Sequence, residues 1–155
     1  KSLKKIYYNV PTLITSGSLL SLNVYRIVGN FRNDFFIDSV DFEYSLRIRK
    51  NGFVNLLSPE IAINHRLGNY KEKKYLFLTI KSTNHSPLRR YYMARNHAII
   101  SSQYFLSFPF WVIKKNYFFV KSILEIILID DHKLSKIKKT FLGLKNGMFY
   151  KSTER

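Results

Sequence analysis

The sequence has 155 residues and lacks cysteine altogether. A chain without cysteine forms no disulfide framework and no sulfur-bound zinc site, so disulfide-stapled folds and zinc fingers are excluded. Acidic residues are also scarce, with ten Asp and Glu against 26 Lys and Arg and a formal net charge of +16. Such a charge attracts polyanions, which include nucleic acids, anionic membrane surfaces and phosphorylated substrates.

The sequence also lacks a long uninterrupted apolar run. Its most apolar region, residues 104–129, is broken by a proline and four charged residues, namely Pro109, Lys114, Lys115, Lys121 and Glu125. Because a membrane span needs roughly 20 mostly apolar residues, we expect no spanning helix. Residues 1–10 have neither the apolar run nor the cleavage site of a signal peptide. A hydrophobic content of 46% nevertheless suits a folded body, to which we expect an appendage.

The pattern of residues 12–84 is typical of a mixed α/β body. Apolar spacing and turn residues predict helices at residues 23–28, ending at Gly29, and at residues 41–50, ending at Asn51-Gly52. Apolar runs predict extended pieces on either side of Gly17 and strands at residues 53–57, 61–64 and 75–80. Gly17 is either an ordinary turn residue or a point where a ligand approaches the backbone.

The pattern becomes helical beyond Ser86-Pro87. Residues 88–104 contain no helix breaker and predict a helix, and Pro109 ends the aromatic run that follows. The last predicted helix carries an apolar stripe among lysines, formed by Leu134, Ile137, Phe141 and Leu144. Such a basic amphipathic helix either contacts a membrane interface or packs on the body as an ordinary helical subdomain.

A series of motifs then points to a family. In order, the motifs are residues 15–18 (TSGS), 28–31 (VGNF), 36–47 (FIDSVDFEYSLR) and 50–53 (KNGF). Their order and spacing resemble the second half of the GT-A domain of family 2 glycosyltransferases. Further motifs at residues 64–68 (NHRLG), 85–92 (HSPLRRYY) and 95–96 (RN) resemble the rhamnosyltransferase subgroup of that family.

The resemblance implies both a fold and a domain organisation. The fold class would be α/β, the C-terminal portion of a GT-A (Rossmann-like) domain followed by a helical basic tail. Residues 1–84 would form the acceptor-side part of the catalytic domain, and residues 85–155 a tail at the membrane interface. The nucleotide-binding units and the Asp-x-Asp metal motif normally precede this part, so we expect a truncated enzyme or half of one.

The resemblance places the catalytic base at Asp41, at the start of the helix predicted for residues 41–50. Such a carboxylate removes the acceptor hydroxyl proton in an inverting transfer, and a helix amino terminus favours its ionised form. Val40 stands where glutamate is common in the family, and Asp38 is a candidate for part of that role. The alternative is that Asp38 or Asp41 simply caps the helix. Glu43 is assigned to an ion pair with Arg47.

The other candidate residues would contact phosphate or metal. The resemblance assigns His65 to the diphosphate or its divalent metal, Mg or Mn, whose principal ligands would lie outside this chain; the alternative is a structural histidine. Four residues of the helix predicted for residues 88–104 would bind donor or acceptor phosphate: Arg89, Arg90, Tyr92 and Arg95. The alternative is a solvated helix with tyrosines packed on the body. Asp130-Asp131 imitates a metal motif but lies in the tail.

The function implied is that of an inverting transferase that moves a sugar, rhamnose in the subgroup, from a nucleotide-sugar donor. The acceptor would be a polyprenyl-diphosphate-linked glycan used in cell-surface polysaccharide synthesis. The protein would then be cytoplasmic and peripheral, on the anionic inner face of the plasma membrane. Two alternatives stay open: a non-catalytic remnant that docks on membranes, and a basic nucleic-acid-binding protein. We expect no nucleic-acid partner, because no RNA-recognition, helix-turn-helix or finger signature is present.

Overall fold

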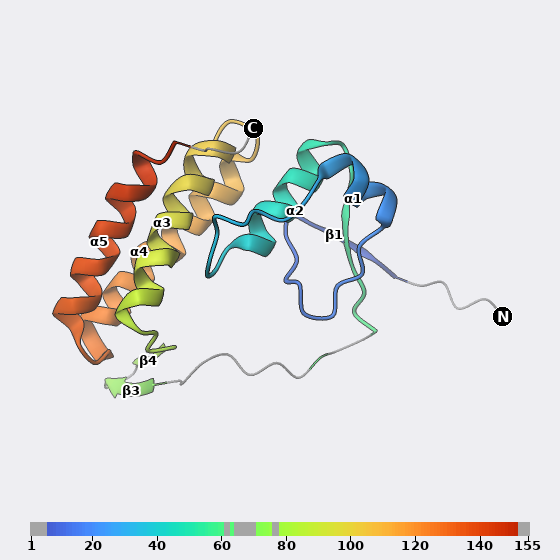
Figure 1. The fold of residues 1–155 in the computed structure, drawn as a ribbon. Coiled ribbons are helices and arrows are strands. Elements are labelled where there is room, and N and C mark those ends of the chain that lie inside the picture. The colour runs from blue at the N-terminus through green and yellow to red at the C-terminus, as the bar shows by residue number, and fades with distance from the viewer. Residues whose placement is uncertain (1–5, 61–62, 64–70, 76–77, 152–155) are drawn as a thin grey trace. The chain divides into compact units, whose positions relative to one another are not determined.

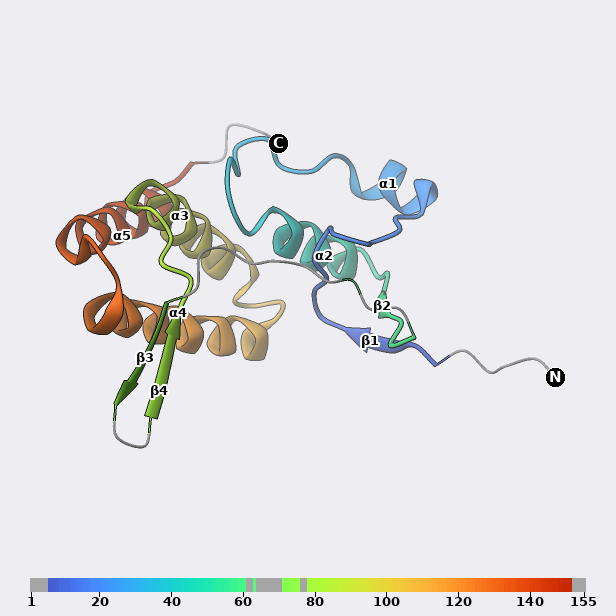
Figure 2. The same ribbon diagram turned by 90° about the horizontal axis from the view of Figure 1, so that it is seen from below.

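The computed structural model describes residues 6–60, 63, 71–75 and 78–151. The chain forms two compact units, which we call unit 1 (Lys1–His65) and unit 2 (Arg66–Arg155) (Figure 1). The sequence places the boundary after residue 84 instead. The difference arises because the β-hairpin that precedes residue 84 packs against a helix of unit 2 (Figure 2).

Unit 1 contains the strands β1 (Tyr8–Val10) and β2 (Asn55–Leu57) and the helices α1 (Leu22–Val28) and α2 (Val40–Lys50). The two strands pair antiparallel, with Tyr8 opposite Leu57. The two helices share a small core built from Val28, Tyr44 and Ile48, against which Val24, Phe31 and Phe53 pack. Both predicted helices and the strand near residues 53–57 are therefore confirmed.

Two other predictions for unit 1 are not confirmed. Residues 12–21 form no strand, and the chain instead turns at Gly17, where the Ser18 amide donates to the Thr15 carbonyl over 3.1 Å. The predicted extended pieces around Gly17 are thus loops. The predicted strand at residues 61–64 lies outside the described residues except for Ile63, which is in no strand.

Unit 2 begins with a hairpin of β3 (Lys71–Tyr75) and β4 (Leu78–Ser82), followed by α3 (Pro87–Tyr104), α4 (Pro109–Ile129) and α5 (Lys133–Met148). The prediction of a single strand at residues 75–80 is wrong, because Tyr75 ends β3 and Leu78 begins β4. The helix predicted for residues 88–104 is confirmed as α3, with Ser86 as its N-cap. Pro109 begins α4 rather than ending an element, since proline suits the first turn of a helix.

The apolar stripe predicted for the last helix does not form the buried face of α5. Leu134 and Phe141, from the predicted apolar stripe, are 66% and 59% exposed. The buried face is lined instead by Lys136, Thr140, Gly143 and Gly147. A Cβ at either glycine would overlap a backbone carbonyl oxygen of α3, so the absence of side chains lets the two helices come close. Figure 2 shows α3 and α5 side by side.

Among the described residues, no helix combines the length and the apolarity that crossing a membrane would require.

Candidate functional site

The predicted catalytic base, Asp41, lies in the first turn of α2. The turn is preceded by two residues with left-handed backbone conformations, Asp38 with φ of 72° and Ser39 with φ of 66°. Non-glycine residues adopt this region rarely, and such conformations cluster at functional sites. The Ser39 hydroxyl donates to the Asp38 carboxylate over 3.2 Å rather than capping α2. The Phe42 amide donates to the Asp41 carboxylate over 2.9 Å, so Asp41 accepts one amide of the helix, as the capping alternative requires.

Asp41 lines a small cavity of about 80 Å³ between α2 and the loop of residues 13–20. The polar residues that share this cavity are Thr15, Ser18, Tyr44, Ser45 and Asn55. A second cavity of about 390 Å³ is lined by Gly17 and other residues of the same loop, together with Leu56 and Leu57 of β2. Only the second cavity reaches the 300–1,000 Å³ that ligand pockets usually have. The loop thus lines both a small site that contains the carboxylate and a larger space.

Two buried side chains of unit 1 hold this loop against α2. The Ser45 hydroxyl accepts from the Leu13 amide over 3.1 Å and donates to the Leu13 carbonyl over 3.4 Å. The Asn55 amide donates to the carbonyls of Pro11 and Ser45, over 2.9 and 3.1 Å. These bonds fix the backbone that faces Asp41. The sequence alone points to neither residue, because no periodic pattern marks hydrogen bonds between residues 10 to 44 positions apart.

The ion pair predicted between Glu43 and Arg47 is present. The guanidinium donates to both carboxylate oxygens of Glu43, over 3.1 and 3.0 Å, and Glu43 is only 1% exposed. Arg47 also donates to the carbonyls of Val28 and Asn30, at the end of α1. The pair therefore joins α2 to α1, and it accounts for Glu43 without a catalytic role.

Gly17 has a φ of 74°, which favours glycine. A Cβ at this position would overlap the side chain of Ile63, so the backbone does come close to another group. In this structure the group that lies close to Gly17 is the side chain of Ile63, and not a ligand. Both alternatives for Gly17, a turn residue and a point of close approach, agree with this geometry.

The four candidate phosphate-binding residues of α3 belong to unit 2 and differ in their surroundings. Arg89 is exposed in the first turn of the helix. Arg90 is 4% exposed and pairs over 3.5 Å with the buried carboxylate of Asp130. Tyr92 packs edge to face against Tyr91, with ring centroids 5.1 Å apart. These positions make Arg89 accessible to a phosphate, whereas Arg90 already serves a buried carboxylate.

Arg95, the fourth of these residues, is half-buried between aromatic rings. Its guanidinium lies 6.0 Å from the centroid of Tyr92 and 5.0 Å from that of Tyr150. Such stacking is a favourable cation–π arrangement and orients the planar guanidinium. The structure thus brings two of the four candidate residues, Tyr92 and Arg95, into contact.

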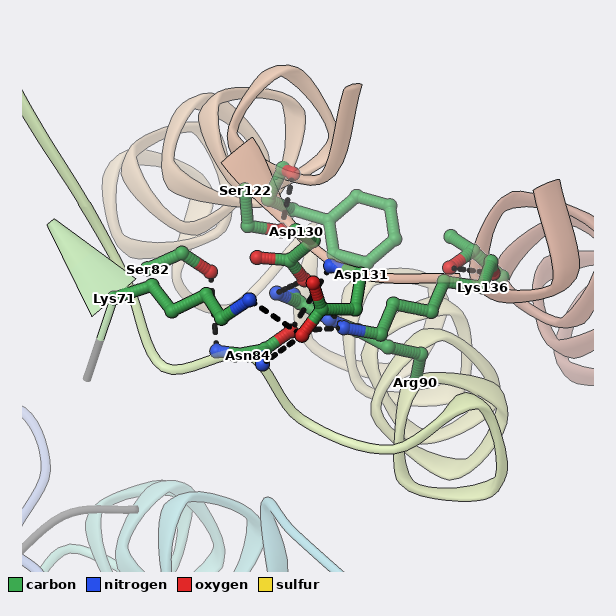
Figure 3. A network of polar contacts seen from close by, with 10 residues as sticks. Lys71, Ser82, Asn84, Arg90, Ser122, Asp130, Asp131 and Lys136 are labelled. Atoms are coloured by element: carbon green, nitrogen blue, oxygen red, sulfur yellow. Dashed lines mark hydrogen bonds and ion pairs between the residues drawn. The ribbon is translucent and has the colours of Figure 1, made fainter. Parts of the chain in front are cut away.

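The buried carboxylate of Asp130 is the centre of a polar network in unit 2 (Figure 3). Lys136, only 2% exposed, donates to Asp130 over 2.9 Å and also to Asn84. Burial alone would raise the pKa of Asp130, but hydrogen bonds from Ser82 and Lys136, with the charges of Lys136 and Arg90, outweigh it and lower the pKa. The network links α3, α4 and α5 to the hairpin.

The neighbouring Asp131 belongs to the same network. Its carboxylate accepts from Lys71 and from Asn84, the latter over 3.0 Å. A hydrogen bond from Lys71 is the main cause that lowers the pKa of Asp131. Both carboxylates of the apparent metal motif therefore have cationic partners. Within the part of the chain that the structure describes, no group of three or more His, Cys, Asp or Glu is placed to hold a metal ion.

His65, the candidate metal ligand, lies outside the described residues. Another histidine, His97, forms a structural contact between α3 and α4. Its ring stacks on Phe119 with centroids 4.3 Å apart, and its Nε2 lies 2.8 Å from the Asn116 side-chain oxygen. Burial lowers the pKa of His97, which favours the neutral ring.

Comparisons with known proteins bear on what this arrangement does. No protein-family model and no solved structure matches the chain. The chain is 30% identical over 135 residues, 87% of its length, to the dTDP-rhamnosyl transferase RfbF of Shigella flexneri. This similarity supports a glycosyltransferase. The chain spans 44% of the length of that relative.

The architecture agrees with the similarity at a coarse level. Helices combined with small sheets are compatible with a fragment of an α/β protein. The finer assignment to family 2 and to the GT-A fold stays a prediction.

Proposed function

We propose that this chain is the acceptor-side part of an inverting glycosyltransferase and that Asp41 is its catalytic base. The observation that carries the proposal is the position of Asp41, whose carboxylate lies in the first turn of α2 and lines a cavity. The two left-handed residues before it, Asp38 and Ser39, support a functional site, because strained backbone is retained where it positions chemistry. The similarity to a rhamnosyl transferase supports the same reaction class.

In the proposed step one proton is transferred, one bond to the anomeric carbon forms and another bond to that carbon breaks. Asp41 accepts the proton of the acceptor hydroxyl as the hydroxyl oxygen attacks the anomeric carbon of the donor sugar. The bond from that carbon to the diphosphate breaks on the opposite side, so the configuration inverts and the nucleoside diphosphate departs with the bonding electrons. The positive end of α2 keeps the carboxylate ionised before the step.

The donor and acceptor are inferred from the family resemblance and from the similarity to a dTDP-rhamnosyl transferase. The proposed donor is a nucleotide-linked rhamnose, bound chiefly by polypeptide outside these 155 residues. The proposed acceptor is a polyprenyl-diphosphate-linked glycan, whose phosphates would be held by Arg89 and Arg95. Arg90 contributes to the fold instead, because it is buried against Asp130.

A divalent metal, Mg or Mn, is part of the family resemblance, but the described residues do not fit one. Asp130 and Asp131 both pair with cationic side chains, and the described carboxylates form no cluster with metal-ligand geometry. We therefore assign no step to a metal. His65 stays a candidate ligand, to be tested by substitution.

The proposed place of action is the cytoplasmic, anionic inner face of the plasma membrane, where a polyprenyl-linked acceptor would reside. The charge distribution supports this location. Unit 2 contains 18 Lys and Arg against five Asp and Glu, whereas unit 1 contains eight against five. The excess positive charge is thus concentrated in one unit and suits an anionic surface.

The proposal is tested by sugar transfer from labelled nucleotide sugars, using the chain joined to a nucleotide-binding half. We expect Asp41→Asn to lower the rate by about 10²- to 10⁴-fold, the usual contribution of a general base. Glu60→Gln is the matched control, because it removes an exposed carboxylate of unit 1 that lines neither cavity. Transfer by the Asp41→Asn protein at the parental rate would show that the assignment of the base is wrong.

A further inference from the structure

The helix α4 exposes a continuous apolar face to solvent. Phe110 is 87% exposed, Tyr117 66% and Leu124 53%, and these residues recur every seven positions. The positions between them on the same face are also apolar and exposed, namely Ile113, Val120 and Ile127. Spacings of three and four residues place all six side chains along one side of the helix.

The opposite side of α4 is already occupied. Val112 and Ile126 are each 1% exposed, and Phe119 stacks on His97 of α3. The outward face is therefore a second apolar surface on a helix that is packed within unit 2. A soluble surface rarely exposes so much contiguous apolar area, and such patches mark interaction sites.

Lysines border this outward face. Lys114 and Lys121 are both exposed and lie seven residues apart, so they project on the same flank of α4. Across the rest of unit 2 the excess of basic residues is large. The apolar face is thus bordered by two lysines and belongs to a unit of net positive charge, which suits an occupant that is apolar inside and anionic at its surface.

A second copy of the chain fits this face less well. The three-and-four spacing could form a helix pair, but positions that flank such a seam usually carry opposite charges. Here the flanking charges are Lys114 and Lys121, and the acidic residue of the helix, Glu125, is half-buried. Pairing two units of high positive charge would be opposed by repulsion.

We propose that the outward face of α4 inserts into the headgroup region of an anionic lipid bilayer, with α4 lying along the surface. The helix has 21 residues and is about 31 Å long at 1.5 Å per residue, so many apolar side chains enter together. Lys114 and Lys121 contact anionic headgroups beside them. This inference deepens the membrane location in the proposed function and rests on it, but its test requires no sugar transfer.

The test is flotation of the whole chain with vesicles of phosphatidylcholine, with and without phosphatidylglycerol. We expect binding to the anionic vesicles and at least about tenfold weaker binding after Leu124→Glu, which places a charge on the face that would enter the bilayer. Ile27→Glu is the matched control, because Ile27 is an exposed apolar residue of a helix in unit 1. Equal loss with both variants, or none with Leu124→Glu, would overturn the proposal.

Substitution of the two lysines provides a second test of the proposal. Lys114→Ala with Lys121→Ala should weaken binding to anionic vesicles by about 25-fold, or about fivefold for each lysine. Removing two exposed charges from unit 1, with Arg26→Ala and Lys50→Ala, should change binding much less. If both pairs of substitutions weakened binding equally, the net charge of the chain would account for binding, and the two lysines beside α4 would have no special role.

The position of the helix can be measured directly, because Trp111 is the single tryptophan. Replacing Trp111 with Phe and Tyr117 with Trp moves the fluorophore to the outward face. Brominated lipids should then quench the emission, and circular dichroism checks that the variant folds. Absence of quenching in bound protein would overturn the proposal. So would a lipid-free dimer that Leu124→Glu dissociates, because a second copy would then be the occupant.

Discussion

The two units of this chain are stabilised in different ways. Unit 1 has a small apolar core, two cavities and a loop fixed by hydrogen bonds from Ser45 and Asn55. Unit 2 has three long helices, two of which meet through glycines, and a buried carboxylate with two cationic partners. Unit 1 therefore offers space and a strained turn beside a carboxylate, whereas unit 2 offers a rigid cationic body with an apolar outer face.

This difference suggests a division of roles. Cavities and left-handed residues reduce stability, and they persist where they position chemistry. Close helix contacts and a buried carboxylate paired with two cations favour a single arrangement, which suits a part that attaches the protein to a surface. The four predictions that follow test whether the two units depend on such different interactions.

The largest expected effect is in the polar network of unit 2. Lys136→Met leaves the buried carboxylate of Asp130 without its nearest cation, and breaking a buried pair in this way costs about 3–5 kcal/mol. Urea unfolding measures the change. The triple variant Arg90→Met, Asp130→Leu and Lys136→Met should recover most of the loss, because it removes both cationic partners with the carboxylate and leaves no uncompensated charge buried. A single variant as stable as the parent would contradict the role of the network.

The second-largest loss of stability is expected where α3 and α5 come into close contact. Gly143→Ala places a Cβ against the carbonyl oxygen of Tyr91, which is backbone and cannot move aside cheaply. We expect a loss of about 3 kcal/mol in the free energy of unfolding. Ser135→Ala, at an exposed position of the same helix, is the control and should change stability little. Thermal unfolding of both variants compares them, and equal midpoints would show that the helices do not meet here.

A smaller effect is expected in unit 1. Ser45→Ala removes the acceptor of the Leu13 amide and the donor to its carbonyl, and losing such a buried partner costs about 1–2 kcal/mol. Hydrogen exchange should show faster exchange for the Leu13 amide, while amides of α3 keep their rates. If α3 also exchanged faster, the two units would not be independent.

The smallest effect concerns His97. Burial lowers the pKa of this ring, so the unfolded chain binds the proton first as the pH falls through the ordinary value of 6.5. Stability should therefore fall below that pH and level off once the folded protein also binds the proton. His97→Gln should remove this contribution, whereas His132→Asn, at an exposed position, should not. Urea unfolding between about pH 7.5 and pH 5.5 provides the comparison.

Several elements could be predicted from the sequence because their signals are local. The helix α2 was predicted to within one residue from its apolar spacing and the Asn51-Gly52 stop. The ion pair of Glu43 with Arg47 follows from an i,i+4 spacing. Asp41 was placed at a helix amino terminus for the same reason, although its catalytic role stays a prediction.

Other features depend on residues far apart in the chain. The cavity beside Asp41 exists because Ser45 and Asn55 hold residues 11–13, and nothing in the local pattern marks those bonds. The burial of Gly143 and Gly147 in α5 was not predicted, because glycines add nothing to an apolar pattern. Which face is buried depends on α3, where a Cβ at Gly147 would also meet Ala98.

The central claim is that chemistry belongs to unit 1 and membrane attachment to unit 2. The most direct test measures sugar transfer by the chain joined to a nucleotide-binding half, with a vesicle-borne polyprenyl-linked acceptor and with a short-chain soluble analogue. We predict that Asp41→Asn lowers transfer to both acceptors by about 10²- to 10⁴-fold, whereas Leu124→Glu impairs transfer only to the vesicle-borne one. Equal impairment of both acceptors by Leu124→Glu, or transfer by Asp41→Asn at the parental rate, would contradict the account.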